Sequence, residues 1–259
     1  MNARKWIVYL LAIYALLTVV LQYQMNVSRS LSYFLVPLTT ILGFVIALLH
    51  SKERMNWNRT LRLLLSAFVV SLTFESIGVL TGWVYGPYHY TEKLGYLFLG
   101  LVPLIIPVAW FMMMYPSLVV ADWIVPARSP MRFILVSALG AVIMTAWDVV
   151  MDPVMVQGGH WVWEVQGAYF GIPLQNFFGW WLTTFATFLC FVWLGKPELS
   201  NHTDGRFDRQ AILLFIITSL GNIVGALFGG LGGAALAGIF AIFPWMMFGW
   251  IQMSKNKLT

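Results

Sequence analysis

Charged residues are scarce in this 259-residue chain: they make up 10% of it, whereas 60% of the residues are hydrophobic. A soluble domain of this length needs more polar surface than these residues provide. The composition therefore indicates an integral membrane protein with several spans. The net charge is +5, but the basic residues lie between apolar runs, which argues against binding of nucleic acid. We expect residues 1–259 to form one integral domain in the cell membrane, surrounded by membrane lipid.

Cysteine and histidine are also scarce. The single cysteine, Cys190, lies inside an apolar run, which excludes an internal disulfide and a cysteine metal cluster. The histidines are widely separated, at His50, His89, His160 and His202. This spacing argues against haem-bearing bundles and di-iron oxygenases, which need several histidines at helical spacing. We therefore expect neither a metal nor another cofactor.

Apolar runs predict about eight membrane spans, so the expected fold is an all-α, polytopic transmembrane helix bundle. The spans cover residues 6–21, 30–49, 63–81, 96–121, 133–151, 173–194, 211–228 and 231–251. A polar, basic loop is expected at residues 50–61. Pro103 and Pro107 predict that the fourth span is kinked or begins as a broken segment. Pro153 predicts that the fifth span stops at Asp152.

Basic residues are distributed very unevenly between the two sides of these spans. Only Arg29 and Lys93 fall on the side opposite the N-terminus. The positive-inside rule therefore predicts that both termini are cytoplasmic and that loops 82–95 and 153–172 are on the outer side. The thirteen basic residues on the N-terminal side are Arg4, Lys5, Lys52, Arg54, Arg59, Arg62, Arg128, Arg132, Lys196, Arg206, Arg209, Lys255 and Lys257.

Three acidic residues are expected near the outer ends of the third and fifth spans. Asp148 and Asp152 are four residues apart, so they share one face of a helix. Two carboxyls a turn apart in a low-dielectric site do not both ionise easily, so one can keep its proton at neutral pH. Glu75 reaches the same membrane depth from the third span. A purely structural alternative is a polar cluster in which these acids bind neighbouring Trp, Tyr or Asn side chains.

Aromatic residues crowd the two outer loops and the start of the sixth span. One interpretation is an aromatic belt at the membrane interface. The other is an aromatic-lined pocket beside the carboxylates, whose ring faces would attract a carbocation formed during a reaction. The residues expected to contact substrate there are Trp83, Tyr85, Tyr88, Tyr90, His160, Trp161, Trp163, Tyr169, Asn176 and Trp180.

Eight short motifs follow one another along the middle of the chain. They are Glu75-Ser76-Ile77-Gly78, Tyr85-Gly86-Pro87-Tyr88-His89-Tyr90, Val102-Pro103-Leu104, Met114-Tyr115-Pro116-Ser117, Ala146-Trp147-Asp148, Met151-Asp152-Pro153, Gly159-His160-Trp161-Val162-Trp163 and Gly171-Ile172-Pro173-Leu174-Gln175-Asn176-Phe177. This pattern resembles the membrane carotenoid 1,2-hydratase family over about residues 75–181, whereas the flanking spans match only in being apolar.

The resemblance implies addition of water to the terminal C1–C2 double bond of a carotenoid with an open, ψ-type end group. The implied substrates are γ-carotene or the C50 precursors of bacterioruberin. A carotenoid about 30 Å long matches the hydrocarbon core of a bilayer, so its end group would reach the outer leaflet. The implied partners are the carotenoid, water, membrane lipid and other enzymes of the carotenoid pathway.

Hydration of an alkene suits these residue types without a cofactor. A positioned acid protonates one carbon, and water captures the resulting tertiary carbocation. We expect Asp148 and Asp152 to act as a coupled pair. Asp148 is the favoured proton donor because it is deeper in the helix and drier. We expect Glu75 to position or deprotonate the water.

Two other functions stay open at this point. A proton-coupled transporter also buries carboxylates, but it would usually show an internal repeat and a carboxylate near the midplane. A metal-dependent membrane lipid enzyme could use the three acids together with His160, and sensitivity to a chelator would decide this.

Two further functions fit less well. An aspartyl protease would place its aspartates on different helices. A prenyl transferase would need aspartate-rich magnesium motifs and basic residues.

Overall fold

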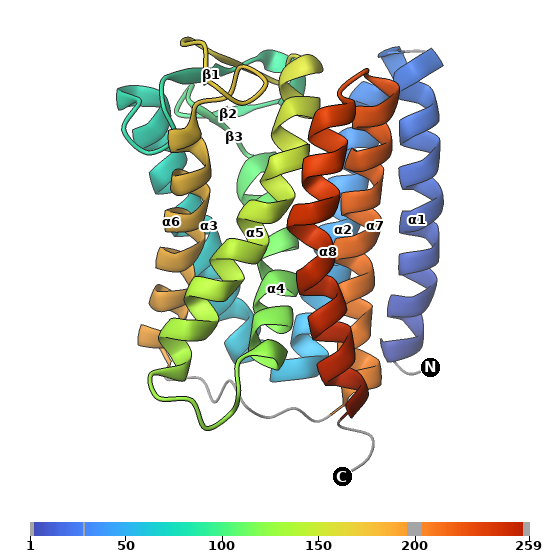
Figure 1. Cartoon of the computed structure of the whole chain (residues 1–259), viewed down its shortest axis with the longest axis vertical. Helices are drawn as coiled ribbons and strands as arrows, with labels where there is room; N and C mark the ends of the chain where they lie inside the picture. Colours follow the sequence, from blue (N-terminus) through green and yellow to red (C-terminus); the bar gives the residue numbers. More distant parts are fainter. Residues whose placement is uncertain (1–2, 28, 196–203, 256–259) are drawn as a thin grey trace.

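The computed structural model describes residues 3–27, 29–195 and 204–255, which form a bundle of long helices with short strands at one end (Figure 1). The architecture is therefore mostly helical rather than all-α. Its helices are α1 (Ala3–Val27), α2 (Arg29–Met55), α3 (Trp57–Thr81), α4 (Ile105–Ile124), α5 (Arg132–Gln157), α6 (Leu174–Trp193), α7 (Gly205–Phe228) and α8 (Gly232–Lys255). A short 3₁₀ helix, η1, covers Glu92–Leu94.

Seven of these helices are long and apolar enough to cross a membrane. Their number and length make the chain a multi-pass membrane protein. The exception is α6, because Gln175, Asn176 and several tryptophans lower its mean hydropathy. It nevertheless packs along α3 and α5 as part of the same bundle. The start of α1 and the end of α8 lie at the end of the bundle opposite the strands (Figure 1).

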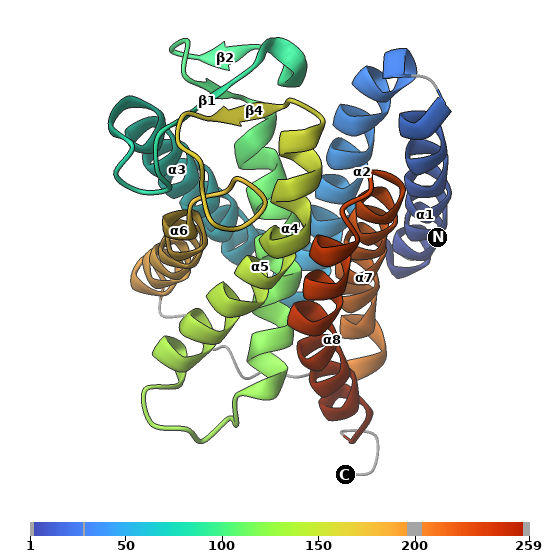
Figure 2. The same cartoon turned by 45° about the horizontal axis from the view of Figure 1, so that its top comes forward.

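Helix α4 lies at the centre of the bundle, packed against α2, α3, α5, α7 and α8. Its sequence is apolar on all sides, which is typical of a helix surrounded by protein. Residues Trp110 to Trp123 are buried without interruption. Figure 2 shows the other helices arranged around it. The central position of α4 lets its side chains contact groups from several helices at once.

The loops that follow α3 and α5 join each other through a small antiparallel sheet. Strand β1 (Tyr88–Tyr90) pairs with β4 (Trp161–Trp163), with Tyr88 opposite Trp163 and Tyr90 opposite Trp161. Alternate residues of a strand point to opposite faces, so His89 and Val162 face outward and the four aromatic rings face the bundle. A second pair, β2 (Leu97–Phe98) with β3 (Val102–Pro103), lies beside it (Figure 2).

Two expected helix boundaries are wrong. Residues 50–55 continue α2 instead of forming a loop, and only Asn56 separates α2 from α3. The fourth helix begins at Ile105, because residues 97–103 form the β2–β3 pair. Pro103 is therefore in a strand. Pro107 is in the first turn of α4, where a missing backbone N–H breaks no helical hydrogen bond.

The expected end of the fifth span at Asp152 is also wrong, because α5 continues through Pro153 to Gln157. Proline has no N–H to donate to the carbonyl four residues earlier, which here belongs to Val149. Tyr169 supplies the missing donor: its hydroxyl bonds to the Val149 oxygen at 2.9 Å. As a result, the two aspartates lie inside a continuous helix, at least one turn before its end.

A buried charged network joins four helices at the end opposite the strands. The Arg54 guanidinium binds Asp122 at 2.6 Å and Asp208 at 2.9 Å. Arg132 binds the other Asp122 oxygen at 2.8 Å, and Trp123 donates to Asp208 at 2.7 Å. The network thus ties the ends of α2 and α4 to the starts of α5 and α7.

Candidate active site

A cavity lies beneath the β1–β4 pair and is bordered by residues from α1 to α7. Its volume is about 1240 Å³, counting the space that is open to the outside. Glu75 and Asp152 both line it, so acids from α3 and α5 reach one space, as the charge distribution predicted. The predicted substrate contacts that line it are Tyr85, Tyr88, Tyr90, Trp161, Trp163, Asn176 and Trp180.

The Glu75 carboxyl accepts hydrogen bonds from three donors on two elements, two from β1 and one from α4. Tyr88 and Tyr90 both donate their hydroxyls to Oε2, the latter at 2.9 Å. The Trp110 indole donates to Oε1 at 2.9 Å. Burial, followed by the neighbouring Glu75 carboxyl, raises the pKa of both tyrosines well above the ordinary value. Both phenols therefore stay protonated and keep Glu75 in one orientation.

One amide connects the two aspartates. The Asn176 Nδ2 group on α6 donates to Asp148 Oδ2 and to Asp152 Oδ2, at 2.8 Å each. The Trp161 indole on β4 donates to Asp152 Oδ1 at 2.8 Å. The two carboxyls therefore lie on one face of α5, as their spacing predicted. Among the described residues, nothing forms a hydrogen bond with Asp148 Oδ1.

The two aspartates differ in their position relative to the cavity. Asp152 is part of the wall, whereas Asp148 is not, and both are almost completely buried at 1% and 0% exposure. Asp148 therefore lies behind Asp152 and reaches the space through the shared Asn176 amide. This arrangement also fits a structural polar cluster, since Trp and Asn side chains do bind the acids.

Stacked indole rings form one wall of the cavity. The rings of Trp110 and Trp180 are stacked with centroids 4.2 Å apart, and Trp147 meets Trp180 edge-on at 5.8 Å. Trp110 and Trp147 were missed by the sequence reasoning. Trp147 could have been found, because it directly precedes Asp148. Nothing in the apolar run around Trp110 distinguishes it from an ordinary core residue.

Three predicted substrate contacts lie outside the cavity wall. Trp83 is 82% exposed on the turn after α3, because the αL glycine at position 82 redirects the chain there. Tyr169 is used to bind the Val149 carbonyl. His160 is buried beside Lys93, and burial together with this positive charge lowers its pKa to about 4. His160 is therefore neutral at physiological pH.

A metal site built from the acids and His160 would require these groups to converge. Within residues 3–27, 29–195 and 204–255, no group of three or more His, Cys, Asp and Glu side chains is placed to hold a metal ion. Glu75 instead uses its oxygens to accept from tyrosine and tryptophan donors. This geometry favours acid–base chemistry over metal ligation.

Comparisons with known proteins agree with the resemblance seen in the motifs. The model of a family described as "Carotenoid biosynthesis protein" matches residues 33–244. A bisanhydrobacterioruberin hydratase from Haloarcula japonica is 33% identical over 129 residues, a segment that is 49% of this chain and 43% of the relative. The alignment thus spans less than half of either protein. No solved structure matches the chain significantly.

Proposed function

Because the chain belongs to the carotenoid biosynthesis protein family, we propose that it is a carotenoid hydratase. It adds water to the terminal C1–C2 double bond of an open, ψ-type end group and gives a tertiary alcohol. One observation carries this proposal: Glu75 and the aspartate pair are held separately at one aromatic-walled cavity. The similarity to a hydratase over part of the chain supports the same reaction.

The aspartate pair supplies the proton. Two buried carboxyls that share one amide donor do not both ionise easily, so the pair retains one proton at neutral pH. We assign the transfer to Asp152 because it is in the cavity wall, whereas Asp148 is behind it. Asp148, as the neighbouring carboxyl, would then help Asp152 to keep its proton until the transfer. This assignment differs from the sequence-based preference for Asp148, which considered depth in the helix and not access.

Transfer of the proton to C2 uses the alkene's electron pair to form a C–H bond and leaves a tertiary cation at C1. The faces of the tryptophan rings attract positive charge, so Trp110, Trp147 and Trp180 stabilise the cation. Their packed rings give this part of the cavity an apolar wall, so we expect it to hold little water. Water exclusion strengthens the interaction between the cation and the nearby carboxylates.

Glu75 completes the reaction by directing one water to C1. As the C–O bond forms, the water loses a proton to Glu75, whose orientation is set by Tyr88, Tyr90 and Trp110. A proton must then return to the aspartate pair before the next turnover. The overall reaction consumes one alkene and one water, and it requires no metal or other cofactor.

We place the cavity near the outer leaflet of the cell membrane, with eight spans including α6 and both termini in the cytoplasm. The positive-inside asymmetry supports this orientation, although Lys196 and Lys257 lie outside the described residues. The acids lie toward the strand end of the bundle and not at its middle. This position favours a hydratase over a proton-coupled transporter, whose carboxylate is expected near the midplane.

Expression in a host that accumulates γ-carotene or lycopene tests the reaction. We expect the pigment to gain the mass of one water per hydrated end, and the product to be a tertiary alcohol. Cells that produce Asp152→Asn at matched membrane levels serve as the control. An unchanged pigment mass with the parent protein present in the membrane would exclude the proposed function.

A further inference from the structure

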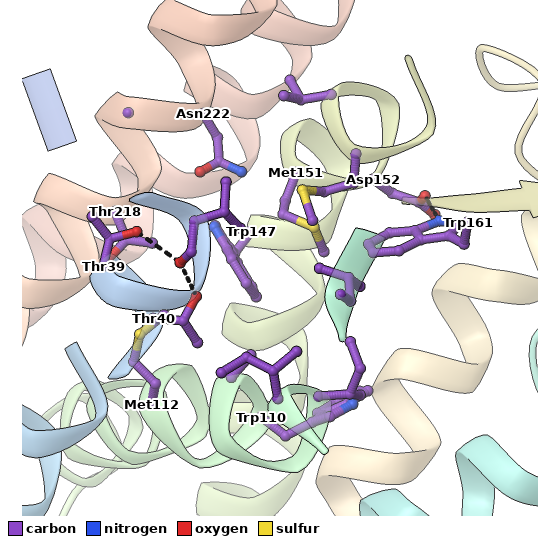
Figure 3. A pocket seen from close by; sticks show the side chains of 18 of the residues that line it. Thr39, Thr40, Trp110, Met112, Trp147, Met151, Asp152, Trp161, Thr218 and Asn222 are labelled. Carbon is purple, nitrogen blue, oxygen red and sulfur yellow. Dashed lines mark hydrogen bonds between the residues drawn. The ribbon is translucent and has the colours of Figure 1, made fainter. Parts of the chain in front are cut away.

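The cavity has a second polar end, away from the acids, that the proposed chemistry does not use. Hydroxyl side chains from three helices line it: Tyr14 and Thr18 on α1, Thr39 and Thr40 on α2, and Thr218 on α7. Figure 3 shows Thr39, Thr40 and Thr218 on one side of the cavity and Asp152 with Trp161 on the other, with Trp147 between them. All three helices lie outside the motif-bearing residues 75–181.

The hydroxyl protons at this end are already committed to protein acceptors. Each threonine donates to a backbone carbonyl of its own helix, in the bonds Thr18 to Tyr14 at 2.8 Å, Thr39 to Leu35 at 2.8 Å, Thr40 to Val36 at 2.9 Å and Thr218 to Leu214 at 2.8 Å. Tyr14 must therefore be the donor in its 2.8 Å bond with Thr218. Toward a ligand, the threonine oxygens can therefore only accept hydrogen bonds, through their remaining lone pairs.

This hydrogen-bonding pattern selects a small neutral donor. A group that binds there must supply O–H or N–H, because the threonine oxygens can only accept. The two charged residues of the cavity wall, Glu75 and Asp152, belong to its other end, so nothing at the threonine end balances an ammonium group at membrane depth. Water satisfies these conditions, since it donates two hydrogens and Asn222 in the same wall can donate to it.

The polar lining also continues toward the outer end of the bundle. Gln22 follows Thr18 by one turn on α1, and Asn222 follows Thr218 by one turn on α7, and both line the cavity. Both helices run toward the end that carries the strands (Figure 1). Above the acids, by contrast, the aromatic face of the β1–β4 pair covers the cavity, with Tyr88 and Trp163 rings 5.1 Å apart.

Building on the proposed function, we infer that the threonine end binds the water that the hydration consumes and supplies it to the carbocation, where Glu75 takes its proton. Trp147 and Met151, between the two ends, keep this water away from the acids until the substrate's end group occupies the cavity. The threonines are therefore expected to control the fate of the cation and not its formation. A cation that captures no water can lose a proton and return to the alkene.

This division of roles can be measured in D₂O. Membranes that contain the protein and its polyene substrate are incubated in D₂O, where the acid delivers a deuteron to C2. Loss of a proton from the cation then returns an alkene that carries deuterium, whereas capture of water gives the alcohol. Mass spectrometry of both pigments gives the ratio of deuterated alkene to alcohol.

We expect the double variant Thr39→Val/Thr40→Val to raise this ratio by about fivefold or more, the scale of losing one net hydrogen bond. Valine keeps the shape of threonine and removes the accepting oxygen. Thr187→Val is the matched control, because Thr187 is a buried threonine that also donates to its own helix but does not line the cavity. Its ratio should equal that of the parent.

Other outcomes would overturn the inference. If deuterated alkene and alcohol fall in parallel in the double variant, the threonines are structural and do not supply water. If the double variant fails to accumulate in the membrane, Asn222→Leu provides the same measurement, and an unchanged ratio there has the same meaning. Absence of alcohol from the parent protein would instead reject the proposed function itself.

Discussion

Tyr169 donates its hydroxyl to the carbonyl oxygen of Val149 at 2.9 Å. Pro153 has no N–H to donate to this carbonyl, so a residue twenty positions beyond Val149 in the chain supplies the donor. A buried acceptor left without a partner costs about 1–3 kcal/mol. Because this bond is only part-buried, we expect Tyr169→Phe to lower the free energy of unfolding in detergent by about 1 kcal/mol, the lower end of that range. Tyr96→Phe, at an exposed tyrosine, should leave it unchanged.

Asp152→Asn should abolish proton transfer while preserving the fold, because asparagine keeps the size of the side chain and its acceptor for Trp161. Hydration should fall by at least ~100-fold, the usual scale for losing a general acid. Asp148→Asn should also reduce hydration, because Asp152 would lose the neighbouring carboxyl that helps it to keep its proton. Rates are compared at equal protein content by pigment chromatography. Near-parental rates in both variants would mean that the pair is only structural.

His160 should make the protein sensitive to mild acid. Its pKa is about 4 in the folded protein, below the ordinary 6.5, so the unfolded chain binds a proton between these values and the folded chain does not. The resulting loss of stability begins as the pH falls below 6.5 and is complete near 4. Between pH 7 and pH 5 it amounts to about 2 kcal/mol.

The measurement is the pH dependence of unfolding in detergent for the parent and for His160→Gln, whose side chain does not titrate. The difference in stability between the two proteins should change by that amount across the interval. Equal pH profiles would show that folding does not lower the pKa of His160.

Removal of divalent metal should leave hydration unchanged. The oxygens of Glu75 and Asp152 are bound by tyrosine, tryptophan and asparagine donors, and the proposed reaction is driven by a proton. The test is activity in membranes after treatment with a chelator. Loss of activity that a single divalent ion restores would favour the metal-dependent alternative.

The orientation in the membrane can be tested with reporter fusions. A reporter that is active only outside the cytoplasm should be silent after Thr259 and active when inserted at Gly158-Gly159. The reason is the concentration of basic residues on the N-terminal side of the spans. The reverse pattern would place the cavity near the cytoplasmic leaflet.

The sequence was sufficient to predict the helix bundle and the gathering of the acids toward one end of it. Apolar runs define the spans, and a spacing of four residues places Asp148 and Asp152 on one face of whichever helix carries them. The chain's continuation through Pro153 could not be predicted, because it depends on the tertiary contact from Tyr169. Pairing of β1 with β4 was likewise beyond prediction, since strands of three residues carry too little periodic signal.

Among the hydrogen-bond partners of the acids, too, some could be predicted from the sequence and others could not. Asn176 was expected near them because it begins the sixth span on the same side of the membrane. The bond from Trp110 to Glu75 depends on how α4 is rotated against α3, and local sequence does not encode that rotation. The polar residues of α1, α2 and α7 seemed ordinary in the sequence, because their common cavity exists only in the assembled bundle.

The buried charged network has a consequence for how the protein is made. Arg54 enters the membrane with α2, 68 residues before Asp122 and 154 residues before Asp208 are synthesised. A buried guanidinium without its partners is costly, so α2 cannot settle into its final position when it is inserted. Arg54 acquires its full set of counter-charges only after α7 has left the ribosome. The nascent bundle therefore stays incomplete at the end that carries this network until translation is almost finished.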